Sequence, residues 1–124
     1  MVKLLIGHKG SGKTKRMIEL ANETVQTARG SIVFINKNSR LIYDLDYKIR
    51  AVCMEDFPHI TNEDEYIGFL FGIMSSDNDI ETIFLDGIMR HRDFALEVLP
   101  SFIEKIKIIS KESERLTEMV LSLL

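Results

Sequence analysis

The chain has 124 residues, the length of one domain, which excludes separate catalytic and recognition domains. Hydrophobic residues make up 45% and charged residues 28%, an ordinary globular composition that excludes wholesale disorder. The formal net charge is −3 and no long basic stripe is present, so the sequence does not indicate a large nucleic-acid-binding surface. A small local basic patch stays open.

The sequence shows no sign of secretion or of a membrane span. No apolar run approaches the roughly 18 residues that a spanning helix needs. The short apolar start from Val2 to Ile6 is interrupted by Lys3 and is followed by glycines and lysines, unlike a signal peptide. The single cysteine, Cys53, excludes an internal disulfide framework and is interpreted as a small buried hydrophobe. We therefore expect one cytoplasmic domain over residues 1–124.

The first third of the chain alternates strand and helix patterns. Val2 to Ile6 predicts a short buried strand, which the glycines of residues 7–12 end. Apolar residues at helical spacing predict a helix from Lys13 to about Ala28, closed by Arg29-Gly30. The continuous apolar run within Ser31 to Ile35 is typical of a strand covered on both faces, as in a parallel sheet.

The middle of the chain predicts a ribbon followed by a helix. Arg40–Tyr43 and Lys48–Cys53 both look extended, and Asp44–Asp46 can turn between them. An almost wholly apolar helix is predicted from about Asn62 to Met74, and its glycines at 68 and 72 would let it pack closely on a neighbour. Its expected capping residues are Thr61, Asn62, Asp64 and Glu65.

The last third begins with a strand, Thr82 to Asp86, and then allows two interpretations. In the first, Pro100 opens a helix to about Glu112, and Leu116 to Leu123 is a strand. In the second, Ile106 to Ile109 is the strand, and a helix runs from Glu112 to Leu124. The pattern of apolar residues does not choose between them.

The turn after the first strand matches the phosphate-binding pattern G-x-x-x-x-G-K-[ST]. Glycines let the backbone wrap around a phosphate, with N–H groups pointing inward at the positive end of the following helix. Lys13 would reach the β- and γ-phosphate oxygens, and Thr14 would place its hydroxyl on Mg²⁺. His8 is more simply an exposed bystander at a variable position of the loop. The predicted nucleotide-binding residues are Gly7, His8, Lys9, Gly10, Ser11, Gly12, Lys13 and Thr14.

An apolar strand that ends in an aspartate, Ile83 to Asp86, supplies the expected second half of the site. Asp86 would hold Mg²⁺ through its water shell beside Thr14. Many ATPases of this type have a glutamate after that aspartate to orient water, whereas this chain has Gly87. Fast hydrolysis therefore lacks its usual base. Three carboxylates could lie at the same edge of the sheet, and the sequence selects none of them: Glu55, Asp56 and Asp44.

Two polar segments could add to this site or could simply be solvated loops. Asn36 to Arg40 follow the second strand, and ligands in open α/β sheets bind beyond the carboxyl ends of strands. Arg90, His91 and Arg92 could meet phosphate charge, either in this chain or on a partner's nucleotide.

Through Ile6–Thr14 and Ile83–Asp86, the sequence resembles the P-loop NTPase superfamily. The whole chain resembles a group of small bacterial single-domain P-loop proteins often labelled "twitching motility" ATPases. The resembling segments are Leu4–Lys15, Asn38–Asp46 and Asp79–Gly87. The resemblance implies that Asp86-Gly87 is the group's normal pattern and that a strand follows the long C-terminal helix, which favours the strand at Leu116–Leu123.

The order of predicted elements also resembles that of bacterial thymidine kinases. Those enzymes carry a glutamate after the acidic strand and a zinc-bound lasso. Gly87 and the single Cys53 depart from both features.

Together these observations predict an α/β three-layer sandwich with a P-loop NTPase core, in which a mainly parallel sheet of about five strands has helices on both faces. We expect it to bind ATP or GTP with Mg²⁺, with Lys13 and Asp86 catalytic and Thr14 and Asp86 at the metal. Hydrolysis would be slow or activated by a protein partner or by a second copy of the chain. The alternatives are a nucleoside or small-molecule kinase and a non-hydrolysing, nucleotide-dependent interaction module.

Overall fold

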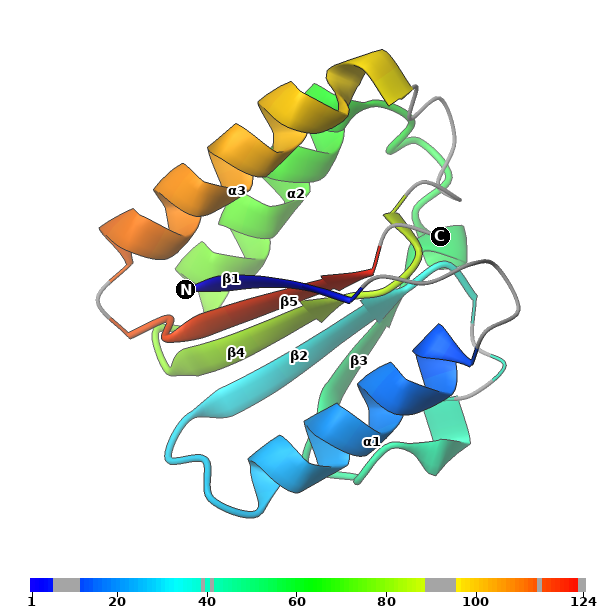
Figure 1. Cartoon of the computed structure of the whole chain (residues 1–124), viewed down its shortest axis with the longest axis vertical. Helices are drawn as coiled ribbons and strands as arrows, with labels where there is room; N and C mark the ends of the chain where they lie inside the picture. Colours follow the sequence, from blue (N-terminus) through cyan, green and yellow to red (C-terminus); the bar gives the residue numbers. More distant parts are fainter. Residues whose placement is uncertain (6–11, 39, 41, 89–95, 114, 123–124) are drawn as a thin grey trace.

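Five strands form one all-parallel sheet in the computed structural model, which describes residues 1–5, 12–38, 40, 42–88, 96–113 and 115–122 (Figure 1). The strand order across the sheet is β1-β5-β4-β2-β3. The strands are β1 (Val2–Leu5), β2 (Ser31–Asn36), β3 (Arg50–Cys53), β4 (Ile80–Leu85) and β5 (Glu118–Ser122). The predicted α/β class and parallel sheet are therefore confirmed.

The helices cover both faces of this sheet, which is compatible with the expected three-layer sandwich. The helices are α1 (Lys13–Val25), α2 (Glu63–Ser76) and α3 (Leu99–Glu112), with short 3₁₀ turns η1 (Ile42–Asp44), η2 (Met54–Asp56) and η4 (Leu96–Val98). Figure 1 shows α1 on one side of the sheet and α2 with α3 on the other. Alternate side chains of β2 follow this division: Ile32 and Phe34 pack with α1, whereas Val33 and Ile35 pack with α2 and α3. This double coverage explains the continuous apolar run of β2.

The chain ends in a helix followed by a strand, as the first of the two interpretations predicts. Phe102, Ile106 and Ile109 are buried at helical spacing on one face of α3, so the alternative strand at 106–109 is wrong. β5 lies between β1 and β4 and pairs in parallel with both. Its side chains alternate between the two cores, with Met119 on the α2 and α3 side and Val120 on the α1 side.

The predicted ribbon between residues 40 and 53 is wrong. Its first half contains the turn η1, and its second half is β3, which pairs in parallel with β2. The Asn22 side chain of α1 holds this segment: its amide nitrogen donates to the Asp44 carbonyl at 2.9 Å, and its oxygen accepts from the Asp46 N–H at 2.8 Å. Ile49 is buried in the core beside α1. These contacts satisfy the backbone in place of an antiparallel partner.

The start of α2 is capped as predicted, but its glycines do not serve close packing among the described residues. The Asn62 side chain accepts from the Glu65 N–H at 2.9 Å, and the Glu65 carboxylate accepts from the Thr61 N–H at 2.9 Å. Gly68 and Gly72 are exposed, and a Cβ added at either would meet no described atom within 4 Å. They lie on an open face of the helix.

Candidate functional site

The amino end of α1 meets the carboxyl end of β4 at one edge of the sheet. Thr14, in the first turn of α1, donates from its hydroxyl to an Asp86 carboxylate oxygen at 2.8 Å, joining residues 72 positions apart in the sequence. Asp86 directly follows β4, and its N–H donates to the Ile35 carbonyl at 2.9 Å. The structure therefore brings together two of the predicted site residues.

The amino end of α1 suits an anion. Gly12 caps it with a φ of +84°, a left-handed conformation that would strain other residues. The first turn contains no acidic residue, and its basic residues Lys13, Lys15 and Arg16 add to the positive end of the helix dipole. Lys13 is 7% exposed and Lys15 is exposed. Of the predicted cradle, residues 7–11 lie outside the described residues.

Sequence reasoning missed Ser122, which lies at the same edge. It is the last residue of β5 and is fully buried. In the register of the sheet it pairs with Leu5 of β1, and the preceding Leu121 pairs with Leu85 of β4. Ser122 therefore lies where the carboxyl ends of β1 and β4 flank β5, next to the position of Asp86. The feature of the sequence that could have indicated Ser122 is its place as a small polar residue directly after the apolar run Met119–Leu121.

Sequence reasoning also missed Tyr66 of α2. Its side chain is buried and packs edge-on against Phe102, with ring centroids 5.7 Å apart. Burial raises the pKa of the Tyr66 phenol above its ordinary value, and the negative charge of Asp86 raises it further. The phenol therefore lies in the core on the α2 side of the sheet, where the charge of Asp86 still acts on it. Its apolar neighbours in the sequence gave no signal of that placement.

The backbone conformation of the residue after Asp86 favours the glycine found there over a glutamate. Gly87 is buried and has a φ of +67°, so a glutamate at this position would be strained. Glu55 and Asp56 do lie at the carboxyl edge, in η2 after β3, but β2 separates β3 from β4, a span of about 10 Å. Asp44 lies beside Asn22 in the second half of α1, away from this edge. None of the three expected carboxylates therefore adjoins Asp86.

The polar segment after β2 is tied to the turn after β3. The Lys37 carbonyl accepts from the Glu55 N–H at 3.1 Å and from the Cys53 thiol at 3.5 Å. Asn36 and Asn38 line a small, mostly apolar cavity that also contacts α1, while Lys37 and Arg40 are exposed. Cys53 is buried, as predicted. Residue 39 and the predicted cationic cluster Arg90, His91 and Arg92 lie outside the described residues.

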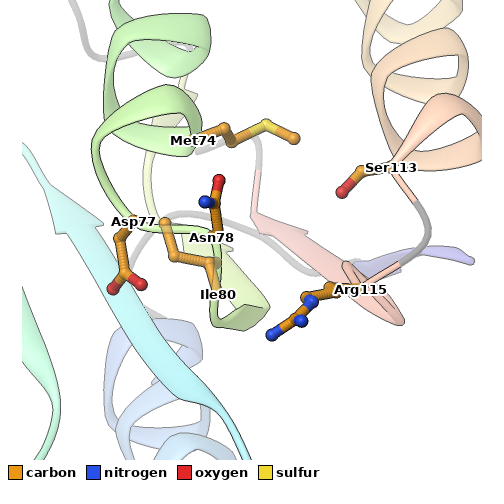
Figure 2. A pocket seen from close by; sticks show the side chains of 6 residues that line it. All are labelled: Met74, Asp77, Asn78, Ile80, Ser113 and Arg115. Atoms are coloured by element: carbon orange, nitrogen blue, oxygen red, sulfur yellow. The ribbon is translucent and has the colours of Figure 1, made fainter.

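An open pocket of about 380 Å³ occupies the opposite edge of the sheet. Figure 2 shows the six side chains that line it: Met74, Asp77, Asn78, Ile80, Ser113 and Arg115. It lies where α2 leads into β4 and α3 leads towards β5, so the length of β4, about 20 Å, separates it from Asp86. Arg115 forms an ion pair with Asp79. The pocket is thus distinct from the edge where Thr14 meets Asp86.

The Thr14 and Asp86 oxygens are hard donors, the kind that Mg²⁺ prefers. Within the described residues, no three His, Cys, Asp or Glu side chains gather as a metal-binding group. A magnesium ion with only one carboxylate and one hydroxyl from the protein fits this setting, because Mg²⁺ commonly keeps several waters and takes its remaining ligands from substrate phosphates.

No helix in the described part of the chain is both long and apolar enough to cross a membrane. Comparisons of the sequence with models of known protein families and with curated proteins found no match.

Proposed function

We propose that this chain is a P-loop nucleotide-binding protein that binds ATP or GTP with Mg²⁺ and hydrolyses it slowly, or only when a partner completes the site. The observation that carries the proposal is the hydrogen bond from Thr14 to Asp86. It joins the last residue of the sequence pattern for phosphate binding to the acid that ends a buried strand, which are the two protein groups expected around a nucleotide-bound magnesium ion.

The arrangement of elements supports a P-loop core. β1 leads through the glycine-rich segment to α1, and β4 ends in Asp86 two positions away in the sheet, with β5 between the two strands. The carboxyl ends of β1 and β4 therefore lie at the same edge, where nucleotides bind in open parallel sheets.

Each residue has a role that its position supports. Lys13 brings a cation to the amino end of α1, where the helix dipole also favours the phosphate chain. Thr14 and Asp86 would hold Mg²⁺, which when bound neutralises charge on the β- and γ-phosphate oxygens. Ser122 lies next to the position of Asp86 in the sheet, so its hydroxyl can orient Asp86 or a water near it. Gly87 supplies no base, which explains why turnover would be slow.

The proposal is tested by calorimetric titration with Mg-ATP and Mg-GTP and by phosphate release, using Lys13→Ala and the matched control Lys15→Ala. Both variants remove one lysine from the same helical turn, but Lys13 is buried and Lys15 is exposed. We expect Lys13→Ala to abolish binding or turnover and Lys15→Ala to lower affinity slightly. A folded wild-type protein that binds neither nucleotide at millimolar concentration contradicts the proposal, as does Lys13→Ala with unchanged affinity and turnover.

A nucleotide-dependent interaction module without turnover is the second candidate, and the backbone at Gly87 favours it. This candidate requires nucleotide binding with a change in shape or oligomeric state and no phosphate release. A nucleoside or small-molecule kinase is the third candidate. The resemblance to thymidine kinases included a ribbon after the second strand, and this likeness is lost because β3 pairs in parallel with β2. ADP release that depends on an added acceptor would identify a kinase.

A further inference from the structure

Two tyrosines are almost fully exposed in the stretch that runs from the end of β2 to the first residue of β3 (residues 37–50, the β2–β3 segment). Tyr43 is 93% exposed and Tyr47 is 90% exposed, while the third tyrosine of the chain, Tyr66, is buried. Apart from the N-terminal methionine, no other described large hydrophobic side chain is more than 53% exposed. Bare aromatic rings of this kind offer flat faces for stacking.

The backbone that carries these rings is held in place. Asn22 of α1 makes hydrogen bonds on both sides of Leu45, to the Asp44 carbonyl and from the Asp46 N–H. Leu45 and Ile49 pack into the core beside α1. Figure 1 shows the turn η1 lying beside α1. The two rings therefore belong to a stretch that Leu45 and Ile49 anchor to the core, so a partner can bind them at little cost in ordering the backbone there.

The β2–β3 segment is also positively charged. It contains four basic and two acidic residues, a net charge of +2 in a chain whose net charge is −3. The basic residues are Lys37, Arg40, Lys48 and Arg50, and all four are exposed. Asp46 uses its carboxylate to accept from the Lys48 N–H at 2.9 Å. The remaining acid is the exposed Asp44.

The four cations have no carboxylate partner among the described residues. Several cations elsewhere on the surface do have such partners, as in Lys3 with Glu118 at 3.2 Å and Lys105 with Asp64 at 2.8 Å. The Lys48 ammonium instead lies 5.8 Å from the centre of the Tyr47 ring. An anionic partner would thus meet cations that need not first leave an ion pair.

We propose that the β2–β3 segment binds single-stranded nucleic acid. Bases stack on Tyr43 and Tyr47, and phosphates contact the cations beside them. Exposed rings can stack on unpaired bases, whereas the bases of a duplex are stacked on one another and out of reach. The basic charge supplies the salt-dependent attraction to the sugar–phosphate backbone. The backbone around Tyr43 and Tyr47 lies beside Asn22 in the second half of α1, away from the Thr14–Asp86 edge, whereas Lys37 follows β2 at that edge. The proposal does not depend on nucleotide binding there.

Fluorescence anisotropy with a labelled oligothymidylate of about 15 nucleotides tests the proposal. A duplex of the same length, polyphosphate and polyglutamate serve as competitors. We expect Tyr43→Ala and Tyr47→Ala each to weaken binding by about 5- to 150-fold, because stacking on each ring is lost. The phenylalanine variants should retain affinity. Phe71→Ala is the matched control, since it removes an exposed ring from α2 and should change nothing.

The salt dependence gives a second, independent readout. Arg40→Gln and Lys48→Gln should each lower the slope of log affinity against log salt concentration by about 0.7, the value for one phosphate contact on a single strand. Lys111→Gln, an exposed cation at the end of α3, should leave the slope unchanged. Far-UV circular dichroism checks the fold of every variant.

Three results would overturn the proposal. The first is no binding of the oligonucleotide at low salt. The second is competition by duplex or polyphosphate as strong as by the single strand, with the tyrosine-to-alanine variants unaffected, which would identify a general polyanion surface. The third is tighter binding of polyglutamate than of the oligonucleotide, which would assign the surface to an acidic protein partner.

Discussion

The hydrogen bond between Thr14 and Asp86 allows the proposed metal-binding roles of both residues to be tested in one double-mutant cycle. Thr14→Val keeps the side-chain shape but removes the hydroxyl, and Asp86→Asn keeps the size but removes the charge. A hydrogen bond to a charged group contributes about 1.5–3 kcal/mol. Because Asp86 is only 4% exposed, Thr14→Val removes a hydrogen-bond donor to a buried carboxylate oxygen and should lower the free energy of unfolding of the nucleotide-free protein by an amount near the upper end of this range.

With Mg-ATP, the two substitutions should weaken binding but should not add. If both residues hold the same ion, removing the first partner already costs most of its contribution. We therefore expect a coupling free energy of about 1 kcal/mol or more between them. Isothermal titration calorimetry with excess Mg²⁺ and with a chelator separates metal-dependent from metal-independent affinity. Thr14→Ser retains the hydroxyl and should remain close to the wild type in both conditions.

Two outcomes would refute this reasoning. One is wild-type affinity of both single variants for Mg-ATP. The other is additive losses that are equally large with the chelator, because they would mean that Thr14 and Asp86 do not share an ion.

Two further predictions concern the fold and are measured as the free energy of unfolding in urea. Gly68→Ala and Gly72→Ala should each stabilise the protein by up to about 1 kcal/mol, since each is exposed inside a helix with open space at its Cβ. Gly30→Ala should instead destabilise it by about 1–3 kcal/mol, because its Cβ would run into a backbone carbonyl; the opposite order of effects would mean that the α2 glycines pack against a partner. The backbone N–H of Thr61, and then its hydroxyl, donate to the Glu65 carboxylate and lower the pKa of that carboxylate. The stabilisation that Glu65 gives the folded protein is therefore fully present above the ordinary pKa of glutamate and is lost as the pH falls through the lowered pKa. Glu65→Gln should abolish that part of the acid sensitivity, and an unchanged pH profile would contradict the capping role.

The sequence predicts the elements that rest on local pattern. The apolar runs of the strands carry enough information for most of the sheet. The helical spacing of Phe102, Ile106 and Ile109 is compatible with α3 but does not exclude a strand at 106–109, and the resemblance to a family made that choice. The capping residues of α2 can likewise be predicted from the sequence, because Asn62 and Glu65 make their hydrogen bonds within one turn of the helix.

The errors arise where distant residues decide. The predicted ribbon is wrong because the Asn22 side chain, more than 20 positions earlier, makes hydrogen bonds with the backbone around residues 44–46. These bonds take the place of those that an antiparallel strand would make. The prediction that the α2 glycines contact a neighbouring element is wrong for the described residues, since both face open space. When a helix is apolar nearly all round, its own sequence does not indicate which of its faces packs against the core.

The candidate site shows the same division. Thr14 and Asp86 were predicted from motifs, and their contact agrees with that expectation. Ser122 reaches the same edge through the strand order, and Tyr66 meets Phe102 through the packing of α2 on α3, which no local pattern encodes.

A crystal structure with Mg²⁺ and a non-hydrolysable ATP or GTP analogue tests the proposed nucleotide site most directly. We expect the terminal phosphates to contact Lys13, and the metal to contact the Thr14 hydroxyl, with Asp86 in its water shell. An analogue bound elsewhere, such as in the pocket beside Arg115, with the hydrogen bond between Thr14 and Asp86 intact and no metal near it, would contradict the proposed site.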